Sequence, residues 1–293
     1  MDRLATFFGN RRVRLGLSVC LLIAVAVFFT VQASKIIGEK KPMWYTEIVS
    51  ANEVRSVSAT VFADETVIPS DSIVLTDLTN GVRIPAQYTI GRNAYGDVVS
   101  TAAGYYYGFV DGYEGVLSAD AAKSLTVASY PALIAAGSYA DPHSVKVLTD
   151  HTIYFAVIAD DAISGRVTVG KQYPAVTDDG ERSFTLTAIS TESNDAGSLT
   201  VFSCNNYPMR HIGSRTVEFD LVIETHSGIS VPKDAVYSYG NYSRVFVFES
   251  GYARQRDIKI IFETDDYYIA GGNISDRELI IREKGLYNGK VMK

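Results

Sequence analysis

The longest apolar run of the chain covers residues 15–34 and contains twenty residues without one charged side chain. Arg11, Arg12 and Arg14 stand directly before it. A helix of this length spans about 30 Å, the thickness of the hydrocarbon core of a bilayer. A helix also satisfies its own backbone N–H and C=O groups inside lipid. The run therefore predicts one transmembrane helix over residues 15–34.

Basic residues are denser on the N-terminal side of this predicted helix than on its other side. Residues 1–14 carry four Arg and one Asp, whereas Lys35, Lys40 and Lys41 follow the run. Short basic flanks tend to stay in the cytoplasm. We therefore expect a single-pass protein of the cell membrane, with residues 1–14 as its cytoplasmic N-terminus and its bulk extracytoplasmic.

A cleaved signal peptide is the alternative interpretation of the same run. Val31, Gln32 and Ala33 before Ser34 resemble a cleavage site with small residues. The run is longer than the usual apolar region of about 7–15 residues in a signal peptide, which favours an uncleaved anchor. Both interpretations place the remainder of the chain outside the cytoplasm.

After residue 54 the pattern changes to short runs of β-branched and aromatic residues that turn signals separate. Apolar residues from Val217 to Ile223 alternate with Glu218 and Asp220, a period of two that is typical of a strand with one buried face. Asp179-Gly180 lies between two such runs and indicates a hairpin turn. Repeated short strands of this kind predict a mainly β fold that contains a barrel or a sandwich.

Two short helical turns are expected outside the apolar run, over residues 118–125 and 130–137. Ser118 can cap the first of them, with Asp120 in its opening turn. Tyr105, Tyr106 and Tyr107 form a conspicuous aromatic run. In a strand two of these rings lie on one face and one lies on the other, so we expect them to pack in a core.

The composition excludes several classes of protein. The 293 residues carry a net charge of −6, and since residues 1–14 contribute +3, the rest contribute −9. An acidic exported region is unsuited to binding nucleic acid or an anionic membrane surface. Cys20 lies in the apolar run and Cys204 stands alone, so no internal disulfide is expected in the exported region.

No pattern of catalytic, cofactor-binding or metal-binding residues stands out in the sequence. The four histidines are widely spaced and match no metal motif. They are His143, His151, His211 and His226. Three acidic pairs lie between apolar runs, where Asp favours turns. They are Asp160-Asp161, Asp178-Asp179 and Asp265-Asp266. We therefore predict a protein that is not an enzyme and has no cofactor, no catalytic residue and no metal site.

Residues 98–118 resemble the second half of biotinyl/lipoyl-like domains. Residues 102–104, 109–110 and 111–117 correspond to the small-Gly, apolar-strand and acidic-Gly-turn parts of that pattern, which a return strand completes. Carrier domains of this kind display a lysine at the turn. Since no lysine lies between Lys41 and Lys123, the resemblance implies a structural domain without a swinging arm.

Residues 228–236, 244–248 and 283–291 resemble the membrane-proximal domain of HlyD-like periplasmic adaptor proteins, also called membrane fusion proteins. The resemblance implies a lipoyl-like β-sandwich, a β-barrel and a membrane-proximal β-domain after the anchor. The implied boundaries are 1–14 for the cytoplasmic N-terminus, 15–34 for the helix, 35–60 for a juxtamembrane stalk and first membrane-proximal strand, 61–130 for the lipoyl-like domain, 131–227 for the barrel and 228–293 for the membrane-proximal domain.

This sequence departs from the family pattern at residues 69–97, which predict strands and turns where most adaptors insert a long helical hairpin. The hairpin tip of such adaptors contacts an outer-membrane channel, so that contact is not implied here. A hairpinless form is similar to adaptor-like proteins of bacteria with a single membrane.

The resemblance implies a non-enzymatic extracytoplasmic adaptor that assembles with an inner-membrane transporter, as in efflux, or with other envelope membrane proteins. Self-association into a homo-oligomer is a further expectation. The alternative is a structural cell-envelope or division-associated protein that binds the wall or neighbouring proteins. A third hypothesis, an envelope hydrolase, requires a fold that brings a His, an Asp and a nucleophile together.

Overall fold

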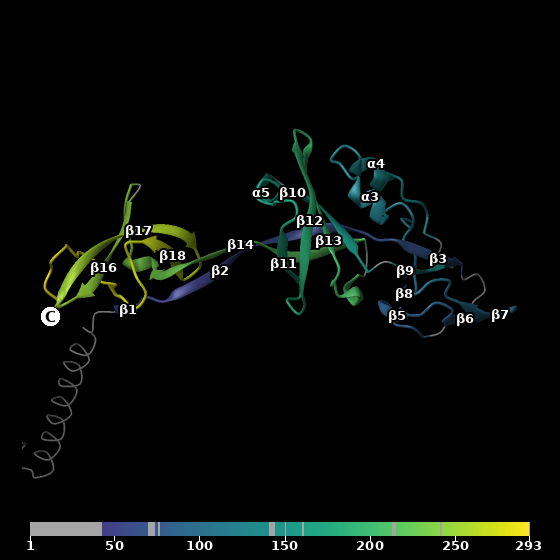
Figure 1. Ribbon diagram of the computed structural model, residues 1–293, viewed down its shortest axis with the longest axis horizontal. Coiled ribbons are helices and arrows are strands. Elements are labelled where there is room, and N and C mark those ends of the chain that lie inside the picture. The colour runs from purple at the N-terminus through teal and green to yellow at the C-terminus, as the bar shows by residue number, and fades with distance from the viewer. Residues whose placement is uncertain are drawn as a thin grey trace, which may run out of the picture. The chain divides into compact units, whose positions relative to one another are not determined.

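The computed structural model describes residues 43–69, 74–75, 77–140, 144–149, 151–159, 161–212, 215–240 and 242–292. The expected transmembrane helix lies outside these residues, and none of the helices within them has the length and apolarity needed to cross a membrane. The described part of the chain is mainly β, as predicted (Figure 1). It divides into two compact units. Unit 1 comprises Met1–Ala51 and His226–Lys293, and unit 2 comprises Asn52–Thr225.

A six-stranded barrel organises unit 2. Its strands follow one another in the order β14, β11, β12, β13, β10 and β2, and β14 also pairs with β2, which closes the barrel. Their bounds are Thr216–Pro232 for β14, Gln172–Thr177 for β11, Ser183–Asn194 for β12, Gly197–Cys204 for β13, Ile153–Ala159 for β10 and Ile48–Phe62 for β2. The predicted barrel is therefore confirmed.

Aromatic rings fill the interior of the barrel. The Phe155 ring lies 5.0 Å from the Tyr207 ring and 5.7 Å from the Phe219 ring between centroids. The predicted alternation is confirmed, because its apolar members all belong to this core, and they are Val217, Phe219, Leu221 and Ile223. The hairpin at Asp179-Gly180 is also confirmed, with Gly180 at a φ of 73° between β11 and β12. Such an inward face excludes water and provides the main stabilisation of the barrel.

Two further sheets of unit 2 form a small sandwich. One contains β3 (Glu65–Pro69), β9 (Ser144–Leu148), β8 (Gly104–Tyr107) and β5 (Val82–Ile84). The other contains β4 (Val74–Leu75), β6 (Thr89–Asn93) and β7 (Gly96–Val99). Ile90 of β6 joins the core of the first sheet. The tyrosine run behaves as predicted, since Tyr106 packs in this core while Tyr105 and Tyr107 pack against the barrel core.

The segment that follows β8 corrects one expectation. Residues 108–118 were expected to contain a strand, an acidic turn and a return strand, but they contain bends and turns and no strand. Asp111 and Glu114 there bond Lys146, which fixes the segment by charge and not by strand pairing. The two expected helical turns are confirmed as α3 (Ala119–Lys123), which Ser118 caps, and α4 (Tyr130–Ala135). The short helix α5 (Asp161–Ser164) was not predicted.

Unit 1 joins segments from the two ends of the described chain. Strand β1 (Met43–Tyr45) pairs with β19 (Leu279–Ile281), which neighbours the hairpin of β16 (Tyr242–Glu249) and β17 (Tyr252–Glu263). Beyond these lie β18 (Tyr267–Gly272) and the end of β14, and β15 (Tyr237–Tyr239) pairs with β16. The boundaries expected at residues 60, 130 and 227 stay predictions.

Both faces of the unit 1 sheet carry apolar residues. Val245 and Val247 pack with Ile280 on one face, and Phe246 packs with Ile281 and Leu286 on the other. The alternation along β16 places these neighbours on opposite sides of the strand. Strand β1 is exposed and joins this sheet by backbone pairing with β19, although more than 230 residues separate the two strands along the chain.

Candidate interaction surface

A surface hollow of about 640 Å³ lies on unit 1. Four segments distant in the sequence contribute its walls. They are β1, the end of β14 with the 3-10 helix η2 (Lys233–Ala235) that directly follows it, the turn between β17 and β18 with the first residue of β18, and the residue after β19. The lining residues are Trp44, Pro232, Lys233, Asp234, Asp265, Asp266, Tyr267 and Arg282. A hollow of this size accommodates several side chains of another protein.

Trp44 forms the aromatic wall of this hollow. It stands on β1 opposite Ile280 of β19, and its indole N–H donates a hydrogen bond to Ser230 Oγ at 3.4 Å. About a third of Trp44 stays exposed, as does two-thirds of the neighbouring Tyr45. Trp44 is therefore both anchored in the sheet and accessible to a partner, the combination found at binding hot spots.

Two ion pairs rigidify the charged walls of the hollow. Arg282 Nε donates to Asp234 Oδ2 at 2.9 Å and Arg282 Nη2 donates to the same oxygen at 2.6 Å. Lys233 Nζ donates to Glu263 Oε1 at 2.8 Å. The bonded carboxylates raise the pKa of Arg282 and of Lys233, so both stay charged near neutral pH.

Asp265 and Asp266 leave the rim of the hollow acidic. They lie in the turn between β17 and β18, as their sequence position predicted. Both are exposed, and neither forms an ion pair within the described part of the chain. A rim of uncompensated carboxylates around an aromatic centre favours a partner with basic residues at its periphery.

Exposed large apolar side chains are frequent elsewhere on unit 1. Besides Trp44, they are Met43, Tyr45, Ile48, Tyr239, Tyr242, Phe248, Tyr252, Ile261, Tyr287 and Val291. The tyrosines combine apolar area with a polar tip, which suits them to protein interfaces. The described residues of unit 1 therefore present a surface suited to binding another protein.

The histidines and the cysteine of the sequence are dispersed over the structure. His143 lies outside the described residues, as do Asp160 and the side chain of His211. His151 stacks edge-on against Tyr105, and His226 stacks on Phe262. Cys204 is buried in the barrel, and burial raises the pKa of its thiol. A thiol of this kind is mostly protonated at neutral pH and is a poor nucleophile.

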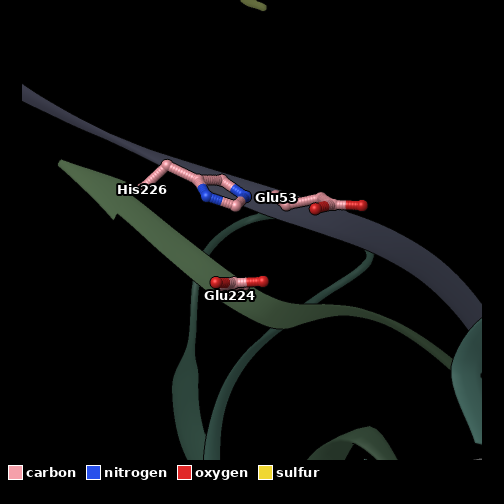
Figure 2. Close-up of side chains that lie close together, drawn as sticks. All are labelled: Glu53, Glu224 and His226. Carbon is pink, nitrogen blue, oxygen red and sulfur yellow. The ribbon is translucent and has the colours of Figure 1, made fainter. Parts of the chain in front are cut away.

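Within the described residues, one group of acidic and histidine side chains has the composition of a metal site. Its members are Glu53, Glu224 and His226 (Figure 2). Glu53 comes from β2, and Glu224 and His226 come from β14. Arg166 donates to both carboxylates, to Glu53 Oε2 at 2.8 Å and to Glu224 Oε2 at 3.1 Å. A cation would compete with this guanidinium for the same oxygens, so we assign no metal here.

A buried ionic cluster in unit 2 was not foreseen from the sequence. Lys146 of β9 bonds Asp111 and Glu114, and Arg215 bonds Asp111 and Glu65. Burial raises the pKa of Glu65 above 4.5 despite the charges of Arg215 and Lys146. Three carboxylates share two cations here, so the most buried one binds a proton most readily. Spacings in the sequence carried no signal, because strand pairing brings these residues together.

No family model matches the sequence, and no curated protein matches it. Solved structures with a similar fold include ZneB from Cupriavidus metallidurans, with 12% identity, a TM-score of 0.29, and coverage of 87% of this chain and 95% of that chain. MacA from Actinobacillus actinomycetemcomitans has 8% identity, a TM-score of 0.40, and coverage of 82% and 99%. The membrane fusion protein Spr0693 from Streptococcus pneumoniae R6 has 8% identity, a TM-score of 0.31, and coverage of 59% and 100%.

Proposed function

We propose that this chain is a non-enzymatic adaptor, anchored in the cell membrane and extracytoplasmic in its bulk, that binds an envelope membrane protein such as a transporter through the hollow around Trp44. The aromatic and charged composition of that hollow is the observation that carries the proposal. Its acidic rim and ion-paired walls suit a protein partner better than a small substrate.

The position of Trp44 along the chain supports the choice of partner. Only nine residues separate it from the apolar run that ends at Ser34. A fully extended segment of that length spans about 35 Å at most. If residues 15–34 form the anchor, the hollow stays within that distance of the membrane, where exported loops of an integral membrane protein lie.

Photo-crosslinking in intact membranes tests this function. A photoreactive amino acid replaces Tyr45, which is exposed and directly follows Trp44 on β1, or Tyr95, which is almost fully exposed on unit 2. We expect the variant at residue 45 to crosslink to an integral membrane protein identified by mass spectrometry, and the variant at residue 95 not to do so. A Trp44→Ala substitution should weaken the crosslink from residue 45.

The same experiment separates the competing hypotheses. Recovery of the residue 45 variant as an uncrosslinked monomer contradicts the adaptor function. Crosslinks to a wall-bound or division protein favour the structural envelope role instead. Crosslinks between two copies of this chain indicate self-association, which we also propose for the adaptor.

A further inference from the structure

A second surface pocket, of about 340 Å³, lies on unit 2 at one end of the barrel. The β11–β12 hairpin contributes Arg182 to it, and the connection from β13 to β14 contributes Tyr207 and Arg210. Because neighbouring barrel strands are antiparallel, these two connections meet at the same end. Tyr105 of β8 completes the wall. This pocket shares no residue with the hollow on unit 1.

The two arginines of this pocket have no acidic partner. In the described part of the chain, four arginines form no ion pair with a carboxylate, and they are Arg83, Arg182, Arg210 and Arg254. Asp178 and Asp179 lie on the same hairpin as Arg182, but Asp179 bonds Thr177 and a backbone N–H instead. Asp178 and Asp179 are close enough to Tyr207 to raise the pKa of its hydroxyl, but the charged side chains that line the pocket itself are those of Arg182 and Arg210.

Arg83 adds a third guanidinium beside the pocket. Arg83 and Tyr105 are direct cross-strand partners on β5 and β8, so their side chains share one face of the sheet. Arg83 Nη2 lies 3.3 Å from His151 Nε2, and the His151 ring packs edge-on against Tyr105. An imidazole carries no negative charge, so this contact does not pair Arg83 with an anion.

The backbone that carries Arg210 is held firmly. The Tyr107 hydroxyl donates to the Met209 carbonyl oxygen at 2.7 Å inside the core. Gly81 approaches so closely that a Cβ there would lie 2.9 Å from Arg210 Cα. Such fixed positions reduce the ordering cost that binding imposes on flexible arginines.

We infer that this pocket binds a phosphate monoester group. A phosphate monoester carries a charge of about −1.5 to −2 at pH 7. This charge balances two or three guanidinium groups better than the single charge of a carboxylate ligand would. The planar fork of arginine bonds phosphate oxygens in pairs. The Tyr105 ring offers an apolar wall for the body of the ester.

Calorimetric titration of the full chain in detergent micelles with phenyl phosphate tests this inference. We expect saturable binding in wild type that weakens about tenfold or more in R182Q and in R210Q, because each loses charge-assisted hydrogen bonds. R254Q is the matched control, since Arg254 is unpaired but lies on unit 1, and its affinity should equal that of wild type. Circular dichroism verifies that each variant is folded.

The source of the phosphate is distinguished in a second arm, with mixed micelles that contain phosphatidic acid. If phenyl phosphate binds and both R182Q and R210Q weaken that binding, the natural ligand is a soluble ester. Binding that needs the same arginines but occurs only with phosphatidic acid indicates a lipid headgroup. If neither phenyl phosphate nor phosphatidic acid binds, the inference is overturned. It is also overturned if R254Q loses as much affinity as R182Q and R210Q do. None of these outcomes alters the crosslink expected at Tyr45.

Discussion

Lys146 Nζ lies 2.6 Å from Asp111 Oδ2, and the side chain of Lys146 is only 4% exposed. The lysine belongs to β9, whereas Asp111 belongs to the strandless segment after β8. This pair, with Glu114 and Arg215 around it, fastens that segment to the sandwich. A buried charge of this kind is tolerated only while its partners are present.

Replacement of Lys146 by Met should therefore lower the free energy of unfolding by about 3–5 kcal/mol, because buried carboxylates lose a partner. Urea denaturation followed by circular dichroism measures the change. K123M is the control, since Lys123 and Asp120 form an exposed pair, and it should leave the midpoint unchanged. A Lys146 variant as stable as wild type would show that the cluster adds nothing to stability.

The raised pKa of Glu65 should make the stability of the folded protein depend on pH. Its pKa is above 4.5 in the folded protein and close to 4.5 in the unfolded chain. The folded state therefore holds a proton that the unfolded state has released, and this contribution to stability is full below pH 4.5 and is lost as the pH rises through the raised pKa. E65Q cannot titrate, so its stability should fall less than that of wild type from about pH 4.5 to 7.

Asp111 should show the opposite sign. Burial acts to raise its pKa, but the hydrogen bond from Lys146 and the charge of Arg215 lower it below 3.8. The stability contributed by ionised Asp111 is present above pH 3.8 and is lost as the pH falls through the lowered pKa. D111N should therefore lose less stability than wild type on acidification below that pH. Urea denaturation at several pH values measures this difference. An equal loss of unfolding free energy in D111N and wild type below pH 3.8 would contradict this assignment.

A substitution at Gly81 tests how closely its backbone packs against the backbone of Arg210. The φ of Gly81 is +75°, and a Cβ would also lie 2.9 Å from the Met209 carbonyl oxygen. Gly115 has a φ of +77° with no atom near its Cβ position, so it is the matched control for backbone strain. G81A should lower stability by about 1–3 kcal/mol more than G115A, because backbone atoms must shift. Equal effects in thermal denaturation would assign the whole cost to the positive φ.

A substitution at Phe155 tests how much the aromatic interior of the barrel contributes to stability. Phe155 is fully buried between the Tyr207 and Phe219 rings, so F155A should cost about 3–5 kcal/mol through lost contacts and a cavity. The exposed Val169 offers the contrasting variant V169A, which should change stability by less than about 0.5 kcal/mol. Comparable losses in the two variants, measured by urea denaturation, would show that the barrel is not held by this cluster.

Local patterns determined much about this protein without any structure. The alternation from Val217 to Ile223 identified a half-buried strand, Ser118 identified a helix start, and the tyrosine run identified two opposed core faces. These features depend on neighbours within a few residues, where side-chain direction follows from backbone geometry. The same locality explains why the strands expected within residues 108–118 were wrong, since Asp111 and Glu114 bond the distant Lys146 instead.

Only the tertiary structure decided which distant residues meet. The pairing of β1 with β19 creates the hollow around Trp44, and the antiparallel pairing of β12 with β13 gathers Arg182 and Arg210 at one end. A strand pattern specifies which face is buried, but it does not specify which strand lies alongside. The sequence by itself therefore determined the mainly β class and the absence of a recognisable catalytic motif, while long-range strand pairing determined the surfaces that can bind a partner.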